Sequence, residues 1–331
     1  MSENRTESSQ ADQLIEQLDG ELSELKQAHQ TLREKTRKLL MTVAAVILVA
    51  AVVLAATAGE DGIAMAVVLL IGSSMVTAFL LFQRHRQWAT RVLEQVMPAI
   101  CDMHEKLKYA PTVSEDKRAF VEPWQKLELV AHHSKRELNH HLRGRHRNRH
   151  FEVVAARLST GGKDGQTVFD GLLMRIQTGR DVPARIVVRP RSMFSFRLKN
   201  TVEVKLGNES FDERFEVCHD EADPKGEQRV REIFTPEMQE ALLSISREEG
   251  GLTHDRAAIT AGFIHDSLYL TLVQAQSSKV GKVSVEKPVK FLQVRNFLRE
   301  DPQLEKTVRE ALEHVGVIYR IIDRLPERQG G

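Results

Sequence analysis

Two runs of 20 residues without a charged side chain, separated by only four residues, constrain this 331-residue chain more than any other feature. The runs cover residues 39–58 and 63–82. As an α-helix, each would be about 30 Å long, which matches the hydrocarbon core of a bilayer. Gly59, Glu60, Asp61 and Gly62 leave no room for a folded domain between them. The sequence therefore predicts a transmembrane helical hairpin over residues 39–82.

Basic residues flank this hairpin on both outer sides, and the connection between the runs carries only acidic charge. By the positive-inside rule, both termini are cytoplasmic, which predicts a multi-pass protein of the inner (plasma) membrane. A cleaved signal peptide fits poorly, because the first run begins after 38 residues and a second run follows it. A buried hairpin of a soluble protein is the other alternative. Since neither run contains an ionisable residue, nothing supports a channel or carrier role. The flanking basic residues are Arg33, Lys35, Arg37 and Lys38 before the hairpin, and Arg84, Arg86 and Arg91 after it.

The segments on either side of the hairpin have their own patterns. Residues 1–12 are polar and are expected to be disordered. Residues 13–38 have apolar residues at heptad spacing, which predicts an amphipathic, coiled-coil-like helix. Such a helix could form a homo-oligomer, or it could pack on the cytoplasmic domain of its own chain. A juxtamembrane helix is expected over residues 83–108, interrupted at Pro98. The heptad positions are Ile15 and Leu22 on one seam, which His29 and Thr36 break, and Leu18, Leu25, Leu32 and Leu39 on the other.

Residues 109–325 predict a cytoplasmic α+β domain, followed by a tail at 326–331, because strand patterns occur in runs without regular alternation with helices. Strands are expected at 150–160 and 167–178, joined by a Gly-rich hairpin loop at 161–165. Further short strands are expected at 184–190, 194–200, 201–207 and 211–218, and a strand hairpin at 257–273 with its turn at His265–Ser267. Helices are expected at 235–250, capped by Thr235, and from Asp301 to Leu325. The predicted fold class is an α+β domain attached to a two-helix transmembrane hairpin.

Several of these segments also resemble a known family. The stretches FEVVAARL (151–158), FDGLLMRI (169–176), FDERFEVCHDEAD (211–223), IFTPEMQEALL (233–243) and GFIHDSLYLTL (262–272) resemble the bacterial domain-of-unknown-function 3137 family. The preceding hairpin is similar too. The resemblance covers most of residues 85–325 and implies a membrane-anchored α+β domain facing the cytoplasm. It implies no activity.

Composition and local motifs argue against several kinds of site. A formal net charge of +1 and 5% aromatic residues give no support for nucleic-acid binding. Two cysteines are too few for a disulfide scaffold or a four-cysteine zinc site. Cys218, His219 and Asp220 are adjacent, but neighbouring side chains of a strand point to opposite faces. The loop GGKDGQT lacks the spacing of a phosphate-binding loop. Asp170, Asp220, Asp223 and Asp266 are possible acids that no pattern brings together, so we expect no catalytic residues and no cofactor.

The stretch from His132 to His150 contains six histidines and six Arg or Lys residues around one carboxylate. If residues 126–142 are helical, His133, Glu137 and His141 form one stripe. That stripe is about 12 Å long, too long for a single metal ion. Glu137 and His140 have the spacing of a di-iron motif, whose second copy is not evident. We therefore predict no metal site here.

The arginines at the end of this stretch occupy every second position. In an extended strand, Arg143, Arg145, Arg147 and Arg149 would share one side and could bind anionic lipid or an acidic protein. A solvated strand edge that discourages aggregation is the alternative. The overall hypothesis is a non-enzymatic, membrane-anchored module that binds a protein partner or the anionic membrane surface. An uncharacterised membrane-associated enzyme with Asp and His site residues is the alternative.

Overall fold

The computed structural model describes residues 3–57, 59–104, 106–162, 165–191, 198–248, 257–274 and 291–326. The chain divides into two compact units. Unit 1 contains residues 1–99 and 293–310, and unit 2 contains residues 100–292 and 311–331.

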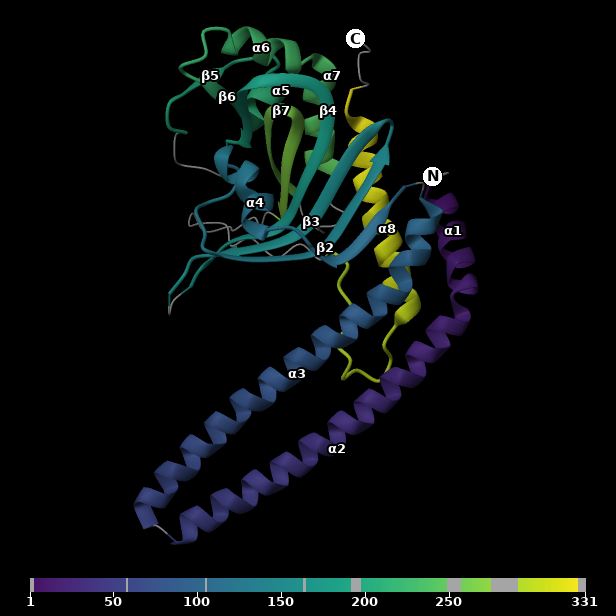
Figure 1. Ribbon diagram of the computed structural model, residues 1–331, viewed down its shortest axis with the longest axis vertical. Coiled ribbons are helices and arrows are strands. Elements are labelled where there is room, and N and C mark those ends of the chain that lie inside the picture. Colours follow the sequence, from purple (N-terminus) through teal and green to yellow (C-terminus); the bar gives the residue numbers. More distant parts are fainter. Residues whose placement is uncertain are drawn as a thin grey trace. The chain divides into compact units, whose positions relative to one another are not determined.

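Unit 1 is built on long helices, α1 (Glu3–Gln17), α2 (Asp19–Thr57) and α3 (Gly59–Met103) (Figure 1). The first apolar run lies in α2 and the second in α3, and both helices are long and apolar enough to cross a membrane. Their apolar side chains are open to solvent, as at Val68, which is 70% exposed. A helix from the core of a soluble protein would bury such side chains, so this exposure argues against the buried hairpin.

Three boundaries differ from the prediction. Helix α1 begins at Glu3, within the segment expected to be disordered, and it buries Ala11 and Leu14. The expected turn at 59–62 forms the start of α3, which begins at Gly59. Helix α3 continues through Pro98 and ends at Met103, so Pro98 does not interrupt it and the juxtamembrane helix stops before residue 108.

The heptad seam of the N-terminal helices is buried within this unit. His29 and Thr36, the two polar residues at positions of the seam, are 1% exposed. The His29 ring lies 5.3 Å from the Trp88 ring, and the Thr36 hydroxyl accepts a 2.6 Å hydrogen bond from Arg84. Through these contacts α2 packs on α3 of its own chain. The C-terminal segment of unit 1 adds two ion pairs to α2, Lys26–Glu305 at 2.9 Å and Arg33–Glu300 at 3.1 Å.

Unit 2 contains a seven-stranded antiparallel sheet and confirms the α+β class. The strand order is β1-β2-β3-β4-β6-β5, and β7 pairs with β4 outside this path. The strands are β1 (Lys108–Thr112), β2 (Lys135–His146), β3 (Arg149–Ser159), β4 (Thr167–Pro190), β5 (Thr201–Val204), β6 (Phe215–Asp220) and β7 (Ala257–Gln274). The helices that belong wholly to this unit are α4 (Lys117–Lys126), α5 (Glu209–Arg214), α6 (Gly226–Ile233) and α7 (Pro236–Glu248). Helix α8 (Leu304–Arg324) begins in unit 1 and ends in unit 2.

The predicted β3–β4 hairpin and the helix after Thr235 are present, whereas several short predicted strands are parts of longer elements. Strand β4 is continuous over 24 residues and includes the separately predicted segment 184–190. The expected hairpin at 257–273 is the single strand β7, in which His265 has a φ of 51° at a register shift rather than a turn. Residues 209–214 form α5, so the extended segment starts only at Phe215. Helices α4 and α6 were not predicted. The loop residues 163–164 and most of the predicted strand 194–200 lie outside the described residues.

The two faces of the sheet are covered by different helices (Figure 1). On β3, Val154, Ala156 and Leu158 face the core formed with α4. The centre of that core is Trp124, whose indole N–H donates to the Leu270 carbonyl at 3.1 Å. Phe151 lies on the opposite face of β3 and contacts Tyr319 of α8, with ring centroids 5.7 Å apart. The α4 face is the one that leads to the candidate site.

Acidification is expected to destabilise unit 2 through His314. This α8 residue is 8% exposed, and its Nδ1 accepts a 3.1 Å hydrogen bond from the Leu292 N–H. Burial lowers the pKa of His314 from 6.5 to about 4. Because the folded pKa lies below the unfolded value, its contribution is complete above pH 6.5 and is lost as pH falls toward 4. At pH 5 the loss is about 2 kcal/mol.

The measurement is thermal unfolding of the detergent-solubilised full chain between pH 7.5 and pH 5, compared with a His314→Asn variant. Asparagine keeps an acceptor but does not titrate in this range. An equally steep decline in the variant would rule out His314 as the cause.

Candidate anion-binding site

A pocket of about 560 Å³ opens on the α4 face of the sheet in unit 2, at the end of β1, β2 and β3. Among the described residues, five Lys or Arg side chains surround it, against a single carboxylate. None of the described residues that line the pocket belongs to a helix. The lining residues are Lys106, Lys108, Arg143, Gly144, Arg145, His150, Phe151, Glu152, Arg175 and Gln177.

Strand register explains why these residues meet. Lys108 of β1 is the cross-strand partner of Arg143, and Arg143 is the partner of Glu152. Glu152 is in turn opposite Arg175. The four side chains therefore form a row across neighbouring strands, about 4.8 Å from one to the next. A second row, two residues farther along, contains the cross-strand pair Arg145 and His150.

Arg175 is the best-anchored cation of the pocket. Its guanidinium lies 5.9 Å from the ring centroid of Tyr269, and its Nε donates a 3.2 Å hydrogen bond to Ser267. The Glu152 carboxylate is 3.9 Å from Arg175 Nη1. Stacking on an aromatic ring covers only the face of a guanidinium, so its N–H groups still point outward in the plane of the group.

The charges of β1 and β2 are less compensated. Among the described residues, neither Lys108 nor Arg143 forms an ion pair with a carboxylate within 4.0 Å. Arg145 donates a 3.1 Å hydrogen bond to the neutral amide of Asn148. The pocket therefore has an excess of positive charge that is concentrated on its β1–β2 side, which suits an anionic ligand.

The four arginines expected on one side of a strand do not share a side, so that part of the interpretation is wrong. Arg147 and Asn148 both have positive φ values, 46° and 60°, and form the two-residue turn between β2 and β3. Arg143 and Arg145 line the pocket before the turn. Arg147 pairs with Asp323 at 2.9 Å, and Arg149 is 6% exposed and donates to the Pro326 carbonyl. A tight turn reverses the chain within the alternating stretch, which strand alternation alone could not reveal.

Two histidines of the same stretch, His140 and His141, pack against aromatic rings. Residues 135–146 form β2 rather than a helix, with a bulge between Asn139 and Leu142. His140, at the bulge, has a φ of 56° and stacks on Tyr109, and His141 contacts Phe120 edge-on. The helical stripe of His133, Glu137 and His141 is therefore wrong. In the described part of the chain, no three His, Cys, Asp or Glu residues are placed to hold a metal ion.

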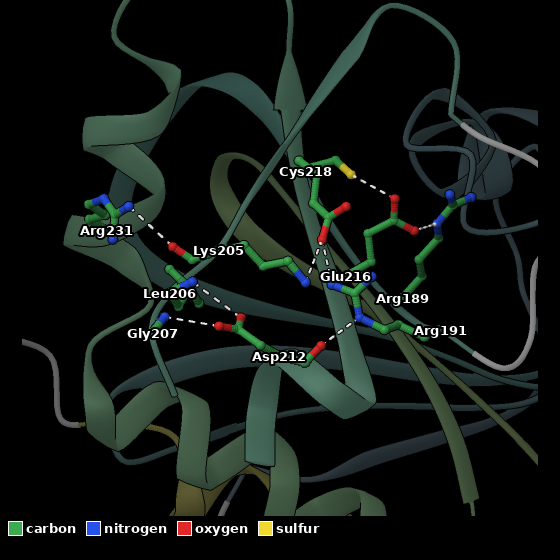
Figure 2. Close-up of polar contacts among 10 residues, drawn as sticks. Arg189, Arg191, Lys205, Leu206, Gly207, Asp212, Glu216, Cys218 and Arg231 are labelled. Atoms are coloured by element: carbon green, nitrogen blue, oxygen red, sulfur yellow. Dashed lines mark hydrogen bonds and ion pairs between the residues drawn. The ribbon is translucent and has the colours of Figure 1, made fainter. Parts of the chain in front are cut away.

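Cys218 and His219 lie on opposite faces of β6, as strand alternation predicts. The Cys218 thiol is 3.6 Å from Glu216, and Figure 2 shows Glu216 also contacting Arg189. His219 Nδ1 instead lies 2.8 Å from the Asp220 carbonyl oxygen. Burial and the nearby Glu216 raise the pKa of Cys218 to about 11. The thiol is therefore protonated at neutral pH and is a poor nucleophile.

Each of the four aspartates has its own side-chain partner. Asp170 pairs with Arg157 at 3.1 Å, and Asp220 pairs with Arg185 at 3.0 Å. Asp223 pairs with Arg229, and Asp266 accepts a 2.7 Å hydrogen bond from Gln177. These contacts give the carboxylates structural roles, and the one described hydrogen bond between two of these aspartates joins backbone groups, from the Asp223 N–H to the Asp220 carbonyl at 3.0 Å.

Three cations of the pocket were not anticipated from the sequence: Lys106, Lys108 and Arg175. The only local signals are two lysines spaced by two residues and an exposed arginine within an otherwise apolar strand. Neither pattern predicts that the lysines and Arg175 lie in one pocket, because the register of four paired strands brings these side chains together.

The sequence model of a family described as "Protein of unknown function (DUF3137)" matches residues 167–326. No curated protein matches the chain in sequence. The crystal structure of the mycobacterial trehalose monomycolate transport factor A, TtfA, is similar over 69% of this chain and 94% of that chain, with 10% sequence identity and a TM-score of 0.35. A similarity at this level carries no argument about the pocket.

Proposed function

Since residues 167–326 belong to the DUF3137 family of proteins of unknown function, which implies no activity, we propose the function from the geometry: a membrane-anchored, non-enzymatic module that binds an anionic group in its basic pocket. The observation that carries the proposal is the ring of five Lys or Arg side chains around a pocket whose described lining contains one carboxylate. Binding is favoured over catalysis because the thiol and the aspartates named above are engaged in structural contacts.

The anchor in this proposal is the hairpin of α2 and α3. Two observations support it: each helix contains a long run without a charged side chain, and the apolar side chains of these runs are exposed. The basic flanks favour cytoplasmic termini. The pocket would then face the cytoplasm, where phosphorylated metabolites, lipid headgroups of the inner leaflet and acidic proteins are possible sources of the anion.

Reporter fusions test this topology. Fusions at residue 1 and residue 331 are expected to report a cytoplasmic location, and a fusion within residues 59–62 an external one. Fusion of the same reporters to a cytoplasmic protein and to an exported protein provides the calibration. An external C-terminus would contradict the proposed arrangement.

Arg143→Gln combined with Arg145→Gln tests the pocket. In the full chain, reconstituted in nanodiscs of zwitterionic lipid at low salt, the double variant is expected to bind tripolyphosphate at least tenfold more weakly. The reason is that two of the least compensated cations of the pocket are removed. Isothermal titration calorimetry measures the change.

A matched control removes the same charge elsewhere in unit 2. Lys205→Gln with Arg231→Gln changes side chains that are 61% and 51% exposed and that do not line the pocket. This control is expected to stay within about twofold of the unaltered protein, because neither side chain lines the pocket or contacts an anion bound there. An equal loss in the two double variants would mean that overall charge, rather than the pocket, governs binding.

A further inference from the structure

The cations of the pocket form two clusters along the strands. The first cluster is the row of Lys108, Arg143 and Arg175, which also contains the carboxylate of Glu152. The second cluster is Lys106, Arg145 and the imidazole of His150. Arg143 and Arg145 are two residues apart on β2, so the clusters are about 7 Å apart.

Each cluster carries a similar net charge. The first has three cations and one carboxylate, and the second has two cations with a histidine. Counted over the lining residues alone, with the histidine left out, each therefore has an excess of two positive charges. A phosphate monoester brings about −1.5 to −2 charges at neutral pH, which is enough to balance one cluster but not both.

The type of donor favours phosphate over a carboxylate. Each cluster combines at least one guanidinium with at least one ammonium. A guanidinium binds two phosphate oxygens in a bidentate manner, and an ammonium adds a point charge that can reach a third. A carboxylate has only two oxygens for such donors.

The size of the pocket indicates that the ligand is larger than a phosphate ion. A volume of about 560 Å³ lies in the range of pockets for small organic molecules, and a water-sized group takes up about 30 Å³. Two separate phosphates joined by a small organic or phosphate linker would fill both clusters and the space between them.

We infer that the pocket binds a ligand carrying two phosphate groups, with one group in each cluster. This inference rests on the proposed function that the pocket binds anions. The ligand is a soluble bisphosphorylated molecule or a lipid whose headgroup carries two phosphates. Glu152, the one carboxylate among the lining residues that the structure describes, belongs to the first cluster and would accept a hydrogen bond from a hydroxyl group of the linker.

The test uses the full chain in zwitterionic nanodiscs and three probes: inorganic phosphate, tripolyphosphate and citrate. Tripolyphosphate is expected to bind at least tenfold more tightly than phosphate, and phosphate is expected to bind with a stoichiometry of two per chain. Citrate is expected to bind at least tenfold more weakly than tripolyphosphate. Calorimetry gives the affinities and the stoichiometry.

Single variants assign the clusters. Arg143→Gln and Arg145→Gln should each lower the phosphate stoichiometry from two to one and weaken tripolyphosphate binding about tenfold. Glu152→Gln should strengthen phosphate binding severalfold, because it removes the repelling carboxylate. Circular dichroism confirms that each variant is folded, and the gain of affinity in Glu152→Gln cannot result from a folding defect.

The outcomes separate this inference from the proposed function. A stoichiometry of one, with phosphate and tripolyphosphate bound equally and both lost in the Arg143→Gln, Arg145→Gln double variant, would overturn the two-phosphate inference alone. Citrate binding as tightly as tripolyphosphate would overturn the preference for phosphate. If no probe binds, the proposed anion-binding function fails as well.

A comparison of two nanodisc samples distinguishes the sources of the ligand. Nanodiscs that contain a lipid with a bisphosphorylated headgroup are compared with discs that contain phosphatidylserine at equal surface charge. Competition with tripolyphosphate only in the first sample supports the headgroup as ligand. Unchanged binding in both samples supports a soluble ligand.

Discussion

Gly171→Ala is expected to lower the free energy of unfolding of the domain by about 3 kcal/mol, because the new methyl group has no space. Gly171 lies in β4 opposite Ala156, in the segment FDGLLMRI. A Cβ at this position would overlap with the Leu272 carbonyl oxygen and lie 2.8 Å from Val273 Cγ1. The nearest atom belongs to the backbone of β7, so the clash can be relieved only by moving a strand.

Chemical denaturation of the full chain in detergent measures this loss. Gly20→Ala is the matched control, because no atom lies within 4 Å of its Cβ. That control should be neutral or stabilising by up to about 1 kcal/mol, since alanine is the better helix former. Adding Val273→Ala to Gly171→Ala should not restore stability. Recovery in that double variant would show that the side chain, rather than the carbonyl, limits the space.

Glu216→Gln is expected to lower the free energy of unfolding by about 3 kcal/mol, because it removes the charge that faces a buried arginine. Arg189 Nε and Glu216 Oε2 are 2.8 Å apart, and their side chains are only 7% and 18% exposed (Figure 2). They are also cross-strand partners between β4 and β6. The guanidinium cannot regain water without opening this part of the sheet.

Glu227→Gln is the control for this pair. Glu227 and Arg231 lie on the surface of α6 with side chains 63% and 51% exposed, so losing their pair should cost less than about 0.5 kcal/mol. Replacing both buried partners, in Arg189→Met with Glu216→Leu, should recover most of the lost stability. If Glu216→Gln costs no more than Glu227→Gln, the buried pair contributes little.

Strand β4 and the β2–β3 turn hold the pocket residues in place. β4 is the central strand: it pairs with β3, β6 and β7 and carries Arg175 into the pocket. The β2–β3 turn is tied to the end of α8 by Arg147 and His146, which both contact Asp323. The cations of the pocket are thus placed by strands and a turn that have their own structural contacts.

Much of the organisation could be predicted from the sequence because it depends on local composition. The apolar runs of α2 and α3, the β3–β4 hairpin and the helix after Thr235 each have a signal within one segment. The prediction of a hairpin at 257–273 was wrong. His265, Asp266 and Ser267 are residue types typical of a turn, but a bulge accommodates them within the single strand β7. A bulge and a turn have similar residue preferences, and only pairing with β4 distinguishes them.

The sequence by itself determined the two long apolar helices, the α+β class of the domain and the basic character of residues 143–149, because these follow from composition and periodicity along the chain. The tertiary structure alone decided which charges act together. It turned Arg147 and Arg149 away to Asp323 and the Pro326 carbonyl, and it brought Lys106, Lys108 and Arg175 beside Arg143 and Arg145. The physical reason is that a pocket depends on strand register, and pairing between distant segments, rather than local sequence, fixes that register.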